Sequence, residues 1–254
     1  MEERREEAGK SMTLIIGRKP VLEALNSGEE IHQVYILHGQ KGGILDAIRV
    51  ASKNRGIKCS EASTEKFQSI TSNENAQGVA AIKSTQKYFS LDEIISSSKK
   101  SSMSLILVLD SIQDTHNLGA ILRTAECSGV DGVILTRHNS APVNETVIKT
   151  SAGATEHLKI CLVNNLVQAL KELKESGIWI VGSSLKNSKV YTEVDYKLPI
   201  ALVLGNEEKG IRRLTAESCD FIIRIPMKGK IQSLNVSVAA GVLLFEILRQ
   251  RYTV

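Results

Sequence analysis

The sequence has little of what marks metal-binding, disulfide-linked or membrane-spanning proteins. Its 254 residues include four cysteines, and no two of them form a CxxC pair, so neither a zinc site nor a disulfide framework is predicted. No stretch approaches the roughly 18 consecutive apolar residues of a membrane span. The first ten residues, MEERREEAGK, include four Glu and lack the apolar core of a signal peptide. These absences predict a soluble, cytoplasmic protein with no membrane partner and no metal.

Aromatic residues are also scarce, at 4% of the chain. Nucleic-acid surfaces that depend on base stacking need several exposed rings, so any RNA contact is expected to involve mainly phosphates and riboses. The formal net charge of +4 says little, because a polyanion responds to local clusters of charge. Such clusters occur at Arg137 with His138, at Lys209 with Arg212 and Arg213, and at Lys228 with Lys230. Each cluster alone is more typical of a solvated surface than of a phosphate site.

A serine-rich stretch divides the chain into two parts. Residues 96–104, SSSKKSSMS, carry six serines in nine positions, a composition that favours an exposed loop or linker. Strand and helix patterns alternate before it, with Gly28 expected to end the first helix. The sequence therefore predicts a small α/β domain over 12–84, a linker over 85–104 and a larger domain over 105–254.

The larger domain is predicted to be α/β with a parallel sheet. Its strand candidates are apolar throughout, without alternation, as expected when helices cover both faces of the sheet. These candidates are 105–109, 132–136, 178–182, 200–205 and 221–226. Trp179 lies in the third of them and is expected to be in the core. The closing helix, NVSVAAGVLLFEILRQR, offers more apolar surface than one sheet face readily covers, including Val238, Leu243, Phe245 and Ile247.

The common fingerprints of α/β enzymes are missing. Neither GxGxxG nor GxSxG follows a strand, which argues against a Rossmann dehydrogenase and a serine hydrolase. The string GNEEKGIR, residues 205–212, has the spacing of a phosphate loop. However, Ile211 and Arg212 stand where that loop needs Lys and then Ser or Thr. An NTPase is therefore excluded as well.

Three polar, glycine-containing strings remain, each at a strand end, where ligands bind in open parallel sheets. They are LVLDSIQDTHNLGAILRTAECSGVDGVIL, IALVLGNEEKGIRRLT and RIPMKGKIQSLNVSVAAGVLLFEILRQR. In order and spacing they resemble the motifs of the SpoU (TrmH-type) RNA 2′-O-ribose methyltransferases, and SAGA at 151–154 also fits. This resemblance covers most of residues 105–254. The segment 12–84, with GRKPVLEAL near its start and AQGVAAI at its end, is similar to the small RNA substrate-binding domain of part of that family.

The resemblance implies a fold and an activity. The implied fold is a parallel sheet of the SPOUT type, whose C-terminal chain passes through a loop as a trefoil knot. The implied reaction transfers a methyl group from S-adenosylmethionine to a ribose 2′-hydroxyl, on a guanosine of large-subunit (23S-type) ribosomal RNA. A homodimer formed through the closing helix is also implied. Two alternatives stay open at this point: a transfer-RNA ribose methyltransferase, and a non-catalytic RNA-binding factor in ribosome assembly with the same fold.

The resemblance also assigns roles to residues. The catalytic set that it implies is Asn117, Arg123, Glu207, Ser233 and Asn235. The cofactor-binding set is Leu204, Gly205, Asn206, Ile225 and Leu234, and the RNA-binding set is Arg18, Arg123 and Arg137. Taken alone, Asn117 is more typical of a helix cap, and Arg123 of a surface arginine paired with Glu126.

Two positions depart from the family's motifs. Thr115 stands where the first motif usually has proline, which removes a fixed φ without removing a reacting group. Glu208 stands where the second motif usually has glycine. If that position requires a positive φ, Glu208 is strained.

Overall fold

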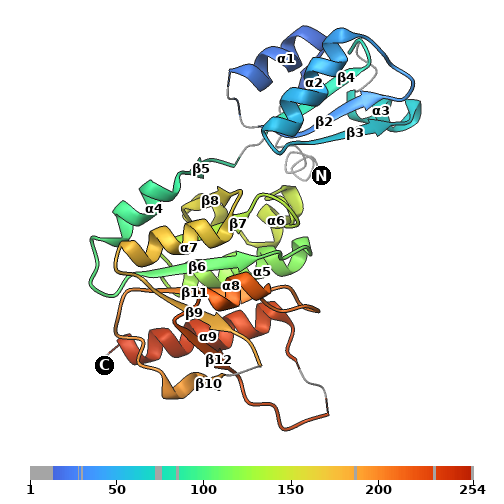
Figure 1. The fold of residues 1–254 in the computed structure, drawn as a ribbon. Coiled ribbons are helices and arrows are strands. Elements are labelled where there is room, and N and C mark those ends of the chain that lie inside the picture. Colours follow the sequence, from blue (N-terminus) through green and yellow to red (C-terminus); the bar gives the residue numbers. More distant parts are fainter. Residues whose placement is uncertain are drawn as a thin grey trace, which may run out of the picture. The chain divides into compact units, whose positions relative to one another are not determined.

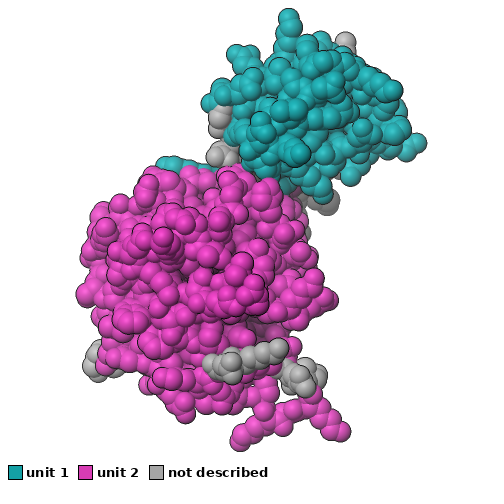
Figure 2. Space-filling view, viewed as in Figure 1, with its two compact units in different colours: residues 1–87 teal, residues 88–254 magenta. Residues whose placement is uncertain are grey.

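The computed structural model describes residues 14–27, 29, 31–71, 76–83, 86–185, 188–230 and 233–252. The predictions about the first ten residues and about Gly28 lie outside these ranges. The chain forms two compact units, Met1–Lys87 and Tyr88–Val254, which Figure 2 shows in different colours. No helix in the described ranges has the length and apolar character needed to cross a membrane.

Unit 1 is a four-stranded mixed sheet with helices on both faces (Figure 1). The strand order is β1-β4-β2-β3, with β2 parallel to β3 and antiparallel to β4. Its elements are β1 (Leu14–Ile16), α1 (Arg18–Asn26), β2 (Ile31–Leu37), α2 (Gly43–Asn54), β3 (Lys58–Ala62), α3 (Thr64–Thr71) and β4 (Val79–Lys83). Helices α1 and α2 bury Val21, Leu25 and Ile48 against one face, and α3 buries Phe67 against the other.

Unit 2 is an eight-stranded parallel sheet in the order β10-β12-β9-β11-β6-β7-β8-β5. Its first half contains β5 (Tyr88–Phe89), α4 (Leu91–Ser98), β6 (Leu105–Asp110), α5 (Thr115–Cys127), β7 (Gly132–Thr136), α6 (Glu145–Thr150), a 3-10 turn η1 (Ala154–Glu156) and β8 (Ile160–Val163). Its second half contains α7 (Leu166–Glu175), β9 (Trp179–Ser183), β10 (Lys189–Val190), a 3-10 turn η2 (Tyr191–Glu193), β11 (Ile200–Gly205), α8 (Arg213–Glu217), β12 (Phe221–Arg224) and α9 (Val236–Arg251).

Both faces of the large sheet are covered, which explains its apolar strands. Leu107 and Leu109 of β6 share a buried cluster with residues of α5, α6 and α9, whereas Ile106 and Val108 share another with residues of α4 and α7. A strand buried on both sides has no need of alternating polarity. The predicted α/β fold with a parallel C-terminal sheet is confirmed. The trefoil knot stays a prediction.

Residues 85–104 were expected to be a linker, but the structure places β5 and α4 there. Strand β5 pairs with β8, and Ile94 and Ile95 of α4 are buried in the core. Helix α4 begins with a capping box, in which the Ser90 hydroxyl accepts from Glu93 N at 3.2 Å and the Glu93 carboxylate accepts from Ser90 N at 2.7 Å. The serine-rich composition describes only the end of this segment.

Trp179 was expected in the core, and this prediction is wrong. The side chain begins β9, is 44% exposed and stacks on Phe221 with ring centroids 5.5 Å apart. As the one tryptophan of the chain, it reports on the folding of unit 2 alone.

Ser90→Ala removes the capping hydroxyl of α4 and is expected to lower the stability of unit 2 by about 1 kcal/mol. The measurement is chemical denaturation followed by the fluorescence of Trp179. Ser96→Ala, an exposed position of the same helix, is the matched control and is expected to change stability by only a few tenths of a kcal/mol. Equal midpoints for the two variants would show that the capping box contributes nothing.

Candidate active site

Three side chains from distant parts of unit 2 form a hydrogen-bonded chain. The Asn235 Nδ2 donates to the Asn117 Oδ1 at 2.9 Å, and the Asn117 Nδ2 donates to the Glu207 Oε1 at 2.9 Å. Adjacent strands position two of them: β6 leads into α5, which carries Asn117, and β11 leads into the turn with Glu207. Because the carboxyl ends of neighbouring parallel strands meet at one sheet edge, the two side chains lie close together. The structure thus brings together three residues of the predicted catalytic set.

The Asn117 side chain can take part in this hydrogen-bonded chain because another residue caps α5. The Asp114 carboxylate accepts from the Asn117 backbone N at 2.7 Å, so the interpretation of Asn117 as the cap is wrong. Thr115 is the first helical residue of α5, a position where proline is also favoured. The departure from the family's proline therefore leaves the helix start intact.

Asn235 is oriented by its own helix. It caps α9, and its Oδ1 accepts from Ser237 N at 2.9 Å and from the Ser237 hydroxyl at 2.6 Å. With its oxygen engaged, the Asn235 amide can only donate to Asn117, which in turn donates to Glu207. Among the described residues no donor bonds the second carboxylate oxygen of Glu207. That oxygen of Glu207 is the free acceptor at the end of the hydrogen-bonded chain.

The turn after β11 is tightly closed. Asn206 and Gly210 exchange backbone hydrogen bonds of 3.1 and 2.8 Å, and the Asn206 Oδ1 accepts from Glu208 N at 3.0 Å and Lys209 N at 3.2 Å. Gly210 carries the positive φ of this turn, at 67°. Glu208 does not have a positive φ, so the strain considered for it is absent. A Cβ at Gly205 would lie 2.1 Å from the Gly210 carbonyl carbon.

The predicted cofactor residues lie on two segments of unit 2. Leu204, Gly205 and Asn206 belong to β11 and its turn, and Leu204 is buried, so only its backbone is available to a ligand. Ile225 and Leu234 lie between β12 and α9, the first half-buried and the second 36% exposed. Two partly exposed apolar side chains and a turn of backbone amides fit what an adenosine moiety needs. Ser233 is exposed beside them.

Arg123 lies apart from the hydrogen-bonded chain. It is exposed on α5, six residues beyond Asn117, which is about 9 Å along the helix axis. Within the described ranges no carboxylate lies within ion-pairing distance of its guanidinium, so the expected surface pair with Glu126 is absent. Its charge is therefore free for a ligand.

The other two predicted RNA contacts lie in different units. Arg137 follows β7, is half-buried and bonds Val163 O through its backbone N at 2.9 Å. Arg18 begins α1 of unit 1, where its Nη2 donates to the Gln40 Oε1 at 2.6 Å and its Nε to the Gln77 carbonyl at 3.0 Å.

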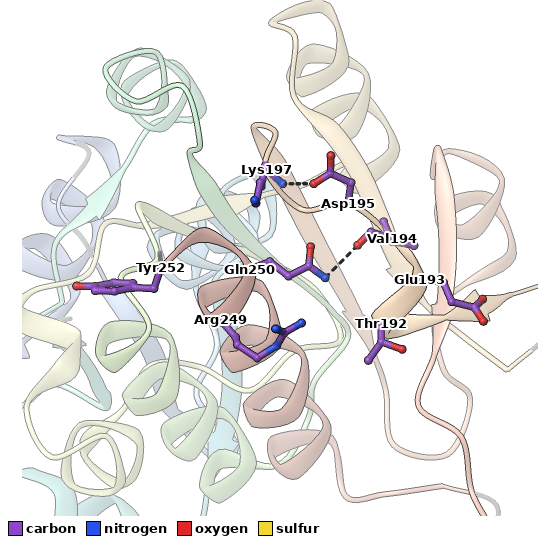
Figure 3. A pocket seen from close by; sticks show the side chains of 8 residues that line it. All are labelled: Thr192, Glu193, Val194, Asp195, Lys197, Arg249, Gln250 and Tyr252. Atoms are coloured by element: carbon purple, nitrogen blue, oxygen red, sulfur yellow. Dashed lines mark hydrogen bonds between the residues drawn. The ribbon is translucent and has the colours of Figure 1, made fainter. Parts of the chain in front are cut away.

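A cavity of about 560 Å³ elsewhere in unit 2 is not this site (Figure 3). Arg249, Gln250 and Tyr252 line it at the far end of α9, where the Gln250 amide donates to Val194 O at 3.1 Å. Gln250 is fifteen residues from Asn235, or about 22 Å along the helix. The cavity also mixes acidic and basic side chains and contains none of the predicted site residues.

Two thiols of unit 2, those of Cys161 and Cys219, are poor nucleophiles. Burial raises the pKa of the Cys161 thiol to about 11 and that of Cys219 to about 12. Both stay protonated near neutral pH, and only the thiolate is a good nucleophile.

Sequence reasoning missed one buried carboxylate at this edge of the sheet. Asp110 ends β6 with a fully buried side chain, which accepts from Arg212 Nε at 2.6 Å and from Arg212 N at 3.1 Å. The available signal was a charged residue at the end of an otherwise apolar strand.

Two family models match the chain. The model of the SpoU rRNA Methylase family matches residues 104–245, and the model described as RNA 2′-O ribose methyltransferase substrate binding matches residues 14–89. The chain belongs to the SpoU rRNA methylase family. It is an RNA 2′-O-ribose methyltransferase, and S-adenosylmethionine, which SpoU methylases use, is its cofactor.

Proteins similar to this SpoU methylase cover between 63% and 95% of its chain. A Staphylococcus haemolyticus protein, whose name assigns it to the TrmH family of tRNA/rRNA methyltransferases, is 38% identical over 95% of this chain and 97% of its own. The AdoMet-bound rRNA methyltransferase of Sinorhizobium meliloti is 27% identical over 94% of this chain and 88% of its own, with a TM-score of 0.62. The Aquifex (A. aeolicus) TrmH/SpoU tRNA modifying enzyme is 37% identical but covers 63% of this chain and 82% of its own, with a TM-score of 0.55.

Proposed function

We propose that this SpoU methylase modifies a guanosine ribose of large-subunit ribosomal RNA in the cytoplasm. The hydrogen-bonded chain of Asn235, Asn117 and Glu207 is the observation that carries the proposal, because it presents one carboxylate oxygen to a hydroxyl. Ribosomal RNA is favoured over transfer RNA by how much of this chain each similar structure covers. The S. meliloti rRNA methyltransferase covers 94% of the chain, whereas the A. aeolicus tRNA modifying enzyme covers 63%. The trefoil knot is part of the proposal, since Asn235, which follows β12 along the chain, bonds Asn117 at the start of α5.

The proposed chemistry is a displacement at a methyl group. S-adenosylmethionine, when bound, supplies that methyl on a sulfonium, and Ile225, Leu234 and the turn at Gly205 would hold it. The free oxygen of Glu207 would accept the hydrogen bond of the ribose 2′-hydroxyl and take its proton when that hydroxyl receives the methyl group. Asn117 keeps the carboxylate in place, and the carboxylate would in turn hold the hydroxyl in one orientation.

Arg123 has a different part in the proposal. A guanidinium hardly deprotonates in proteins, which makes it a poor general base. Its planar fork suits a phosphate, so Arg123 is proposed to hold the phosphate next to the target ribose. Ser233 is proposed to hydrogen-bond the same nucleotide, and Arg137 to contact the RNA backbone.

The proposal is tested by offering the enzyme two RNAs with methyl-labelled S-adenosylmethionine. Unmodified large-subunit ribosomal RNA is expected to be labelled and bulk unmodified transfer RNA is not. Labelling of transfer RNA alone would overturn the ribosomal substrate. If the enzyme binds both RNA and cofactor but labels neither, the non-catalytic assembly factor is the correct function.

A homodimer through α5 and α9 also belongs to the proposal. Leu243 and Ile247, expected to contribute to the dimer surface, are buried within their own unit instead. Val238 and Phe245 stay 52% and 49% exposed, and their spacing of seven residues puts them on one face of α9. Arg123 is exposed on α5, which packs against α9. A two-fold pairing of these faces would bury the apolar pair and enclose Arg123.

Phe245→Glu is expected to convert the dimer to a monomer, because two facing carboxylates would be buried without partners. Light scattering at micromolar concentration should give twice the 27.7 kDa chain mass for the native enzyme and one chain mass for the variant. Val50→Glu, at a position of unit 1 that is 58% exposed, is the control and should stay dimeric. A native enzyme of 27.7 kDa would contradict the dimer.

Arg18 is proposed to contact RNA from unit 1. Both of its guanidinium hydrogen bonds go to neutral oxygens, so its charge is oriented without being neutralised. Arg49, by contrast, pairs with Asp46 and Glu61. Arg18→Gln is therefore expected to weaken binding of large-subunit ribosomal RNA five- to tenfold, as one charge-assisted contact would (roughly 1–1.4 kcal/mol).

The measurement is filter binding of the RNA, with calorimetry showing unchanged cofactor affinity. Arg49→Gln removes the same charge from the same unit and should change RNA affinity less than twofold. Similar losses in the two variants would mean that unit 1 attracts RNA only through its overall charge.

A further inference from the structure

A second polar hollow lies at the same edge of the large sheet, on the face opposite α5 and α9. It is a groove of about 380 Å³ between the segment after β8 and the segment that enters α8. Asn164, Asn165, Arg212, Arg213 and Thr215 supply its polar lining, and the exposed Leu214 supplies an apolar wall. No acidic side chain lines it. The groove therefore has the chemistry of an anion site with room for a sugar or base beside it.

A buried carboxylate fixes the position of Arg212 in this groove. The Asp110 side chain is fully buried and accepts from Arg212 Nε at 2.6 Å and from Arg212 N at 3.1 Å. The Ser111 hydroxyl donates to the same carboxylate at 3.1 Å. A buried carboxylate needs such partners, and here they fix the inner edge of the guanidinium. The side chain of Arg212 is nevertheless 51% exposed, and no hydrogen bond within the described ranges uses its Nη1 or Nη2.

The outer edge of a guanidinium matches a phosphate, because its two Nη groups donate in parallel to two oxygens. Arg213 is less available, since its Nη1 donates to Glu217 Oε1 at 2.6 Å. Arg212 also lies at the sheet edge of the candidate active site, because its partner Asp110 pairs in the sheet with Gly205, which precedes the turn with Asn206 and Glu207. A preorganised donor pair at this place loses little entropy when it binds.

We propose that this groove binds a backbone phosphate of the RNA substrate next to the methylated nucleotide, through the outer edge of Arg212. Asp110 is a positioning residue for that contact. The inference rests on the proposed function, since it assumes an RNA substrate at the neighbouring site. In a simpler role, the ion pair of Asp110 and Arg212 would only close the turn that holds the cofactor. Removing the pair would then weaken cofactor binding as much as RNA binding.

The test replaces the ion pair by two amides, Asp110→Asn with Arg212→Gln, so that no buried charge is left unpaired and the net charge is kept. The matched control is Asp220→Asn with Lys174→Gln. Asp220 likewise accepts a backbone N–H, from Ile180 at 2.8 Å, and pairs with Lys174 at 2.8 Å, but it lies before β12 at the opposite sheet edge. Both full-length variants are compared with the native enzyme by filter binding of unmodified large-subunit ribosomal RNA over a range of salt. Calorimetry measures their affinity for S-adenosylmethionine.

The Asp110/Arg212 variant is expected to bind RNA about tenfold more weakly, and the slope of log affinity against log salt should fall by about 0.7–0.9. Its cofactor affinity should stay within twofold, and the control variant should bind RNA as the native enzyme does. Unchanged RNA affinity and slope would overturn the proposal. So would an equal loss of cofactor affinity, because the pair would then only close the turn. If the native enzyme labels transfer RNA alone, the binding test is repeated with transfer RNA, and the groove is judged separately from the ribosomal substrate.

Discussion

Replacing Arg123 with lysine is expected to lower kcat for RNA methylation about 100-fold, equivalent to about 2.7 kcal/mol of transition-state stabilisation. Lysine keeps the charge but loses the planar fork that holds a phosphate in one orientation. Because the reaction depends on alignment of the 2′-hydroxyl, a small displacement of the adjacent phosphate is costly. Cofactor affinity should not change, since Arg123 is about 9 Å along α5 from Asn117.

Single-turnover methylation with saturating RNA and cofactor measures this effect. Arg49→Lys, in unit 1, is the control and should leave the rate unchanged, because Arg49 pairs with Asp46 and Glu61 within unit 1 and is not a predicted site residue. Near-native turnover in Arg123→Lys would remove Arg123 from the reaction. A fall in cofactor affinity would instead give it a part in binding the methyl donor.

Gly205→Ala is expected to abolish methylation and weaken cofactor binding more than 100-fold. The new Cβ would lie 2.1 Å from the Gly210 carbonyl carbon and 2.2 Å from Ile211 N, which are backbone atoms that no rotamer change can move aside. The turn would have to open, which shifts Asn206 and Glu207 and costs about 1–3 kcal/mol or more. Calorimetry with S-adenosylmethionine and thermal unfolding measure the two consequences.

Gly43→Ala is the control for this substitution. Nothing lies within 4 Å of a Cβ built at Gly43, and its φ is not positive, so the change should be harmless. A Gly205→Ala enzyme that binds the cofactor normally would show that the turn adapts. In that case the closed form of the turn would not be required to hold Asn206 and Glu207 in place.

The sheet could be predicted from the sequence because its physical cause is local. Apolar runs without alternation belong to strands covered on both faces, and β6, with its buried residues on both sides, follows that rule. The linker prediction failed for a related reason. Serine content describes the end of α4, whereas the burial of Ile94 and Ile95 depends on a sheet far along the chain.

The candidate active site was harder to predict from the sequence. Its two hydrogen bonds join residues that lie 90 positions and 118 positions apart in the chain. Nothing local to Asn117 indicates that it bonds Glu207, and taken alone it was interpreted as a cap. Asp114, three positions earlier, has that role. Only the complete set of motifs, through the family resemblance, placed Asn117, Glu207 and Asn235 in one site. Asp110 was missed because the role of a buried acid becomes evident only when its partner is known. That partner, Arg212, lies 102 residues away in the sequence.

Alkaline hydrolysis of the labelled RNA tests whether the enzyme places the methyl group on a ribose 2′-oxygen. Methylation of that oxygen removes the nucleophile that cleaves the neighbouring phosphodiester. The label should therefore remain in an alkali-resistant dinucleotide and be released by enzymatic digestion as 2′-O-methylguanosine. In the Glu207→Gln enzyme this product should be strongly reduced. Label recovered in alkali-released mononucleotides would mean methylation of a base and would contradict methylation of the ribose.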